Sequence, residues 1–158
     1  MKRISLGFLT LLSLSNLVHA ASGNDILGRW LTPEGKAHIE IYPCMDTRYC
    51  GRIAWLKEPH YPADDDQGMA GEIKIDRENP DPKLRGRHTL GLEILWDFRV
   101  AGHRAWEDGK IYDPENGKTY RCLMTLTDGD TLHVRGYIGF SFIGRTSTWT
   151  RIPLGNQP

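Results

Sequence analysis

The fold of this chain is decided in residues 109–152, which read GKIYDPENGKTYRCLMTLTDGDTLHVRGYIGFSFIGRTSTWTRI. Apolar and polar residues alternate along three runs of this stretch, and alternation with a period of two is typical of β-strands with one buried face. Turn residues separate the three runs. The stretch therefore predicts consecutive antiparallel strands at Tyr120 to Leu126, Thr131 to Ile138 and Arg145 to Ile152.

The turn before these strands is Asp113-Pro114-Glu115-Asn116-Gly117-Lys118. Pro114 presets φ for a type I turn, and Gly117 supplies the left-handed residue that closes it. A turn of this length sets Ile111 opposite Tyr120 on the neighbouring strand. The alternation then predicts an apolar face made of Tyr120, Cys122, Met124 and Leu126.

The length of the following turn is limited by the requirement that the apolar residues of both strands share one face of the sheet. A three-residue loop at Thr127-Asp128-Gly129 keeps the apolar residues of both strands on one face, whereas a two-residue loop does not. With Gly129 in the left-handed position, Met124 is expected opposite Leu132. The last strand carries two sets of side chains, and its threonine row faces either a mixed cavity or the solvent. The sets are Thr146, Thr148 and Thr150 on one face and Arg145, Ser147, Trp149 and Arg151 on the other.

The beginning of the chain predicts export. Lys2 and Arg3 precede an apolar stretch that ends in the small-residue pattern Val18-His19-Ala20, which is typical of a cleaved signal peptide. We therefore expect a signal peptide at residues 1–20, a single domain at residues 21–158, and a periplasmic or secreted protein. Without the two basic residues the 20 Lys and Arg fall to 18, against 20 Asp and Glu, so no nucleic-acid footprint is indicated.

Cys44 and Cys50 are expected to form a disulfide. Three cysteines in an exported chain predict one bridge and one free thiol. The alternation of the two flanking strands puts both cysteines on the outer face, opposite each other, and sets Ile39 opposite Trp55. Closing so small a ring stabilises the fold by about 2 kcal/mol. Cys122 lies on an inward face and is expected to be a buried, unreactive side chain.

A long connection interrupts the strand pattern between Lys57 and Leu92. Such a loop in a compact domain is usually functional or forms a lid. Asp81 followed by Pro82 is typical of a helix N-cap with proline in the first turn, so the loop carries at most a short helix. Capping and turn formation account for Asp76 and Asn79.

Short strands with regular turn signals indicate an antiparallel barrel or a sandwich. Gly28-Arg29-Trp30 on the first strand, together with an arginine on the last strand, is similar to the lipocalin signature and favours the barrel. Arg145 and Arg151 are both available for that role. We therefore predict an all-β fold, a small antiparallel up-and-down β-barrel that is lipocalin-like and carries one long loop.

Five strings form a wider pattern, namely Asp25-Ile26-Leu27-Gly28-Arg29-Trp30, Gly51-Arg52-Ile53-Ala54-Trp55-Leu56, Asn79-Pro80-Asp81-Pro82, Ile111-Tyr112-Asp113-Pro114, and Gly144-Arg145-Thr146 with Trp149-Thr150-Arg151. This pattern resembles DUF2147, a family of exported bacterial proteins, over essentially the whole mature chain. The resemblance implies a small lipocalin-like barrel. It carries over no catalytic residue.

A search for chemistry in the sequence nominates no catalytic residue. The mature chain's histidines lack metal-ligand spacing, so no metal site is predicted; they are His38, His60, His88, His103 and His133. Neither a phosphate loop, a dinucleotide fingerprint nor a nucleophile elbow occurs, and we expect no cofactor. An enzyme of unknown reaction stays open as a third hypothesis.

The favoured function is binding of a small apolar or amphipathic molecule inside the barrel. Inward small residues are expected to leave room beside large aromatic ones; the small ones are Ala37, Gly51, Cys122 and Gly136. The predicted ligand-binding residues are Trp30, Trp55, Tyr120, Met124 and Trp149 in the walls, with Phe140 and Phe142 at a loop tip.

The alternative function rests on the segment Phe140 to Ile143. It is apolar where a loop joining two strands is ordinarily polar. It either folds back as a plug or meets a partner. In the second case the protein is a cell-envelope interaction module with a filled barrel, which contacts another protein or the membrane surface through this segment.

Overall fold

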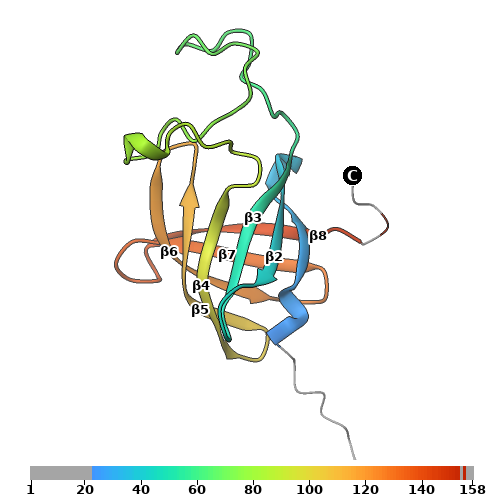
Figure 1. Cartoon of the computed structure of the whole chain (residues 1–158). Coiled ribbons are helices and arrows are strands. Elements are labelled where there is room, and N and C mark those ends of the chain that lie inside the picture. The colour runs from blue at the N-terminus through green and yellow to red at the C-terminus, as the bar shows by residue number, and fades with distance from the viewer. Residues whose placement is uncertain (1–22, 154, 156–158) are drawn as a thin grey trace, which may run out of the picture.

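The computed structural model describes residues 23–153 and 155, which form a closed antiparallel barrel (Figure 1). Each strand pairs with the next in the sequence, and the last pairs with the first. The strands are β1 (Gly28–Leu31), β2 (Ala37–Pro43), β3 (Tyr49–Leu56), β4 (Glu93–Gly102), β5 (Ala105–Asp113), β6 (Lys118–Leu126), β7 (Thr131–Tyr137) and β8 (Gly144–Arg151). The predicted all-β, up-and-down barrel is confirmed.

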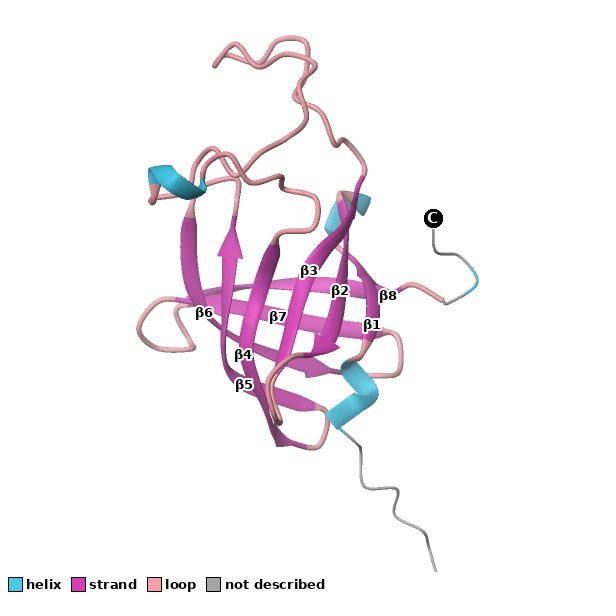
Figure 2. Cartoon of the chain, in the orientation of Figure 1, coloured by secondary structure: helices cyan, strands magenta, loops and turns pink. Residues whose placement is uncertain are grey.

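Helical structure is limited, in the described part of the chain, to short 3₁₀ turns (Figure 2). They are η1 (Gly23–Ile26), η2 (Pro33–Gly35) and η3 (Pro82–Leu84). The last of them confirms the expected cap, since the Asp81 side chain accepts a hydrogen bond from the backbone N–H of Lys83. None of the described helices is long and apolar enough to cross a membrane. The predicted signal peptide lies outside the described residues.

The hairpin of β5 and β6 has the predicted register. Ile111 lies opposite Tyr120, and Asp113 lies opposite Lys118. The backbone N–H of Gly117 donates to the Asp113 carbonyl at 2.9 Å, and Gly117 has a φ of 68°. A side chain at this position would also overlap the carbonyl oxygen of Glu78, so glycine is required both for the turn and for the contact with the long loop.

The hairpin of β6 and β7 keeps the predicted faces but not the predicted register. Met124 lies opposite Val134, and Leu126 lies opposite Leu132, so the prediction of Met124 opposite Leu132 was wrong. Residues 128–130 form the loop, and the Asp128 side chain accepts a hydrogen bond from the Asp130 N–H at 2.8 Å. This turn replaces the one with a left-handed Gly129. The faces survive because a slip of two residues restores the same side of the sheet.

The hairpin of β2 and β3 is shifted as well. Ile39 lies opposite Ile53, and a β-bulge between His38 and Ile39 sets His38 opposite Trp55. The predicted pair of Ile39 and Trp55 was therefore wrong, and the bulge is the reason, since it inserts one extra residue and reverses the alternation beyond it. Trp55 lies half-buried against the ring of His38, with centroids 4.3 Å apart.

The expected disulfide is present between Cys44 and Cys50, with Cα atoms 5.7 Å apart, and Cys122 is free and buried. Cys50 itself lies opposite Tyr42, so the bridge joins a diagonal pair. The observed Cα separation of 5.7 Å lies within the range that a disulfide spans. The bridge was therefore predictable from the sequence, although it did not determine the register.

One end of the barrel is closed by the start and the end of the described chain. The fully buried Trp30 donates from its indole N–H to the carbonyl of Ile26 at 2.9 Å, and the Arg151 guanidinium lies 4.2 Å above its ring. Arg151 also donates to the carbonyls of Leu27 and Asp25. Arg151, rather than Arg145, is thus the arginine that completes the lipocalin-like pair.

The β3–β4 loop, residues 57–92, extends from the other end (Figure 1). Its outer part folds back on itself, because His60 pairs with Ile73 and the N–H of Tyr61 donates to Glu72. In its inner part Ile75 pairs with His88, and the N–H of Gly91 donates to the carbonyl of Ile53 on β3 at 2.8 Å. The loop is therefore ordered by its own hydrogen bonds and then by contacts with the strands.

Candidate functional site

The structure disperses the predicted wall residues. Trp30, Met124 and Trp149 are buried in the core. Alternation predicted this for Met124, and the lipocalin resemblance implied it for the two tryptophans. Tyr120 is half-buried, and Trp55 lies on the outer face with His38. The five residues therefore do not line one cavity.

Neighbouring side chains pack against two of the predicted small inward residues, Gly51 and Gly136, and also against Gly109. A Cβ at Gly51 would contact the side chain of Leu95, and one at Gly109 would overlap the ring of Phe98. A Cβ at Gly136 would meet Ile111 within 3.5 Å. Glycine at these positions leaves space for a side chain of a neighbouring strand, as expected in a close-packed interior.

Two depressions of the described surface have volumes of about 200 Å³ and 470 Å³, and both are open to the solvent. The larger adjoins the loop between β2 and β3 and is lined by residues that include Asp46, Arg48 and Arg99. The smaller lies on the outside of β1, β2 and β3.

The most unusual polar group is Asp76, in the β3–β4 loop. Its side chain is fully buried and accepts three hydrogen bonds: from the Tyr112 hydroxyl at 2.5 Å, the Asn79 amide at 2.8 Å and the Arg87 guanidinium at 2.7 Å, the last of which is also an ion pair. Tyr112 is on β5, so this cluster joins the loop to the barrel. The expected turn is present, since the Asn79 N–H donates to the Asp76 carbonyl at 3.0 Å, and the side chains of both residues also bind Tyr112.

The Asp76 cluster is a structural clamp. Burial, followed by the hydrogen bond to Asp76, raises the pKa of Tyr112 to about 12, so the phenol stays protonated and donates. The carboxylate has partners on both oxygens, as a buried charge requires. Neither surface depression is lined by Asp76 or Tyr112, and the cluster therefore holds the loop rather than exposing a reactive group.

The loop between β7 and β8 contains the largest exposed apolar group in the described chain. We call residues 138–143 the apolar tip; in Figure 1 it is the orange loop that projects from the left of the barrel. The exposed fractions are 69% for Ile138, 68% for Phe140, 75% for Phe142 and 59% for Ile143. The expected alternative of a plug inside the barrel was therefore wrong.

The apolar tip is held in place by hydrogen bonds and ring stacking. Arg135 on β7 donates to the carbonyls of Ser141 at 2.7 Å and Phe142 at 3.2 Å, and to the Thr146 hydroxyl at 2.9 Å. The rings of Phe140 and Phe142 stack with centroids 5.5 Å apart. The aromatic pair is thus presented by a preorganised loop.

The surface that leads to the apolar tip is basic. Between Lys118 and Ile152 the acidic residues are Asp128 and Asp130, at the opposite end of β7. Arg121 lies 5.5 Å from the ring centre of Tyr137, and Arg145 is exposed at the start of β8. The threonine row of β8 is exposed beside them, which decides its orientation toward solvent.

A closed antiparallel barrel with a buried first-strand tryptophan beneath an arginine of the last strand defines a lipocalin-like protein. The chain belongs to DUF2147, described as an uncharacterized protein conserved in bacteria, whose family model matches residues 28–151. The disulfide fits a protein of an oxidising compartment.

A search of solved structures supports the fold. Similarity is found to protein HP1028 from the human pathogen Helicobacter pylori, described as belonging to the lipocalin family, with 24% sequence identity and a TM-score of 0.67. The alignment covers 82% of this chain and 84% of that one. No curated protein matches the chain.

Proposed function

We propose that this protein is an exported cell-envelope module that docks on an anionic membrane surface through its apolar tip. The observation that carries the proposal is the exposure of four large apolar side chains on one loop, Ile138, Phe140, Phe142 and Ile143. Contiguous exposed apolar groups of this kind mark contact sites for proteins or membranes. The close-packed barrel then serves as the rigid support.

The composition of the apolar tip favours a membrane over a protein groove. Aromatic and aliphatic side chains partition into the boundary between headgroups and acyl chains. If the area now exposed on Phe140 and Phe142 enters that boundary, each ring contributes roughly 1.5 kcal/mol of binding free energy. The two isoleucines extend the same apolar surface.

The charges around the apolar tip favour anionic lipid. Arg121 and Arg145 lie on the strands next to it, and the stretch from Thr131 to Ile152 contains no carboxylate. A basic side chain near an anionic membrane contributes about 1 kcal/mol to binding. Arginine also matches the phosphate geometry of a lipid headgroup. Insertion of apolar side chains and attraction of basic side chains to anionic lipid are together the two signals that bind many peripheral proteins to a membrane.

The test is flotation of the purified mature protein with vesicles of phosphatidylglycerol and phosphatidylcholine in equal parts, and with phosphatidylcholine alone. We expect binding to the anionic vesicles and a decrease with added salt. The variant Phe140→Ser/Phe142→Ser should bind about 100-fold more weakly, from the loss of about 3 kcal/mol. Its free energy of unfolding should change by less than about 1 kcal/mol, because both rings are exposed.

A matched control comes from exposed apolar residues elsewhere. Met45 and Val100 are 65% and 47% exposed and belong to the β2–β3 connection and to β4. The variant Met45→Ser/Val100→Ser should float like the parent. Parent protein that fails to float, or a phenylalanine variant that floats equally well, refutes membrane docking. Capture of an envelope protein by a tip that does not bind vesicles replaces it with protein recognition.

A further inference from the structure

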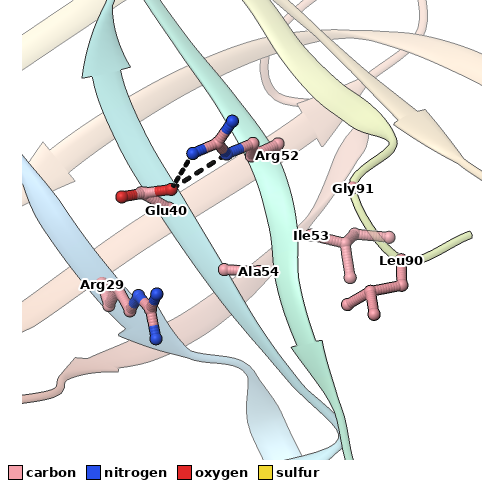
Figure 3. A pocket seen from close by; sticks show the side chains of 7 residues that line it. All are labelled: Arg29, Glu40, Arg52, Ile53, Ala54, Leu90 and Gly91. Atoms are coloured by element: carbon pink, nitrogen blue, oxygen red, sulfur yellow. Dashed lines mark hydrogen bonds and ion pairs between the residues drawn. The ribbon is translucent and has the colours of Figure 1, made fainter. Parts of the chain in front are cut away.

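The depression on the outside of β1, β2 and β3 combines charged and apolar walls (Figure 3). It has a volume of about 200 Å³ and is lined by Arg29, Glu40, Arg52, Ile53, Ala54, Leu90 and Gly91. The first three residues belong to adjacent positions on the three strands, because Arg29 lies opposite Glu40 and Glu40 lies opposite Arg52. Leu90 and Gly91 come from the β3–β4 loop. The loop thus forms one wall of the depression.

The ion pairing across this row is unequal. Arg52 donates to Glu40 from Nε at 2.9 Å and pairs with it through a second guanidinium nitrogen at 2.8 Å. Arg29 lies opposite the same carboxylate, that of Glu40, on the neighbouring strand. It nevertheless forms no ion pair with any residue that the structure describes. Figure 3 shows the dashed contacts between Arg52 and Glu40 alone. The charge of Arg29 is therefore left for another partner.

The Arg29 side chain also lacks a hydrogen bond that its burial requires. Its Nε is buried and has no partner in the described structure. Buried donors without a partner are rare, since desolvation of the group is then uncompensated. His38, in the next position along the outer face of β2, has a buried Nδ1 that is likewise unpartnered, and its ring packs on Trp55. An acceptor bound beside these residues would remove the deficit at Arg29.

We propose that the depression is a binding site for a small carboxylate with a compact apolar body. The Arg29 guanidinium binds the carboxylate, and Ala54, Ile53 and Leu90 contact the body. The depression is small, which suits a single ring or a short chain. Phosphate has no apolar body, so it would contact Arg29 but not the apolar wall of the site. The proposal is independent of membrane docking.

The probe is benzoate, titrated into ¹⁵N-labelled mature protein and followed by amide chemical shifts. We expect saturable shifts at residues 29, 40, 52–54 and 90–91. Acetate, which has the charge without the ring, and benzyl alcohol, which has the ring without the charge, should bind more weakly. Arg29→Gln should weaken benzoate binding about tenfold or more, because a hydrogen-bonded charge pair is lost.

Arg99→Gln is the matched control, since it removes an arginine from the larger depression, and it should bind benzoate like the parent. Leu90→Ser tests the apolar wall at a residue that is 48% exposed, and it serves alone if Arg29→Gln does not fold. The proposal is overturned by the absence of saturable shifts in the parent protein. It is also overturned by unchanged affinity in a folded Arg29→Gln variant or, in its place, in Leu90→Ser.

Discussion

Replacing Tyr112 with phenylalanine tests whether the Asp76 cluster holds the β3–β4 loop on the barrel. The change removes one hydroxyl, which donates to the buried carboxylate at 2.5 Å. A hydrogen bond to a charged group contributes about 1.5–3 kcal/mol. Because Asn79 and Arg87 still bind Asp76, we expect a loss near the lower part of that range, about 2 kcal/mol, in the free energy of loop opening.

The assay is native-state hydrogen exchange of loop amides. The N–H of Asp76 donates to the Arg87 carbonyl at 2.8 Å, and the N–H of Thr89 donates to the Lys74 carbonyl at 2.9 Å. Both bonds lie within the inner part of the loop, the part that contains Asp76, so their exchange reports local opening of that segment. A loss of about 2 kcal/mol predicts exchange about 30-fold faster in Tyr112→Phe.

Tyr42→Phe is the matched control. Tyr42 also donates to a carboxylate, that of Glu93 at 2.6 Å, but this pair is exposed on the barrel surface. Its removal should change exchange at Asp76 and Thr89 by less than about twofold, because exposed polar pairs contribute little. Unchanged exchange in Tyr112→Phe, or equal acceleration by both variants, would refute the role of the cluster as a clamp.

Two further predictions concern pH and thiol chemistry. Because the pKa of Tyr112 is raised to about 12, its contribution to stability is complete below the unfolded pKa of about 10 and is lost as the pH rises through about 12. Alkaline unfolding should therefore show a smaller pH dependence in Tyr112→Phe than in the parent. Identical unfolding curves for the two proteins would contradict the assigned burial. The pKa of Tyr42 is also raised to about 12, so both tyrosines share this window. Reduction of Cys44–Cys50 should lower the unfolding free energy by about 2 kcal/mol in denaturant titrations. Cys122, whose thiol pKa burial raises to about 12, should resist alkylation until the protein unfolds, and rapid labelling of the native protein would contradict this.

The strands β2, β6 and β7 and their faces were predictable from the sequence, because both depend on local properties. Alternation assigns Cys122 and Met124 to the interior without knowledge of the partner strand. The turn around Gly117 was predictable for the same reason, since proline and glycine restrict φ within the turn itself. Arg151 required the tertiary structure, because two arginines of β8 share the same inward parity.

Register was less predictable. The bulge at His38 and Ile39 moved Trp55 to the outside, and no residue type in the hairpin marks it. The two-residue shift of register between β6 and β7 also leaves no mark in the alternation of the sequence, because it keeps each side chain on the same face of the sheet. Parity therefore predicts the side of a sheet, whereas the partner of each residue depends on contacts between strands.

The sequence by itself determined the barrel class, the inward faces of β6 and β7, the disulfide and the apolar composition of the tip. The tertiary structure alone decided that the tip is exposed and that Asp76 meets Tyr112, 36 positions away. It also decided that Glu40 pairs with Arg52, so that the Arg29 Nε has no hydrogen-bond partner in the described structure. The physical reason is the same in each case: burial, partnership and packing are set by side chains that come together only when the sheet closes, and no local pattern records which of two neighbours makes the contact.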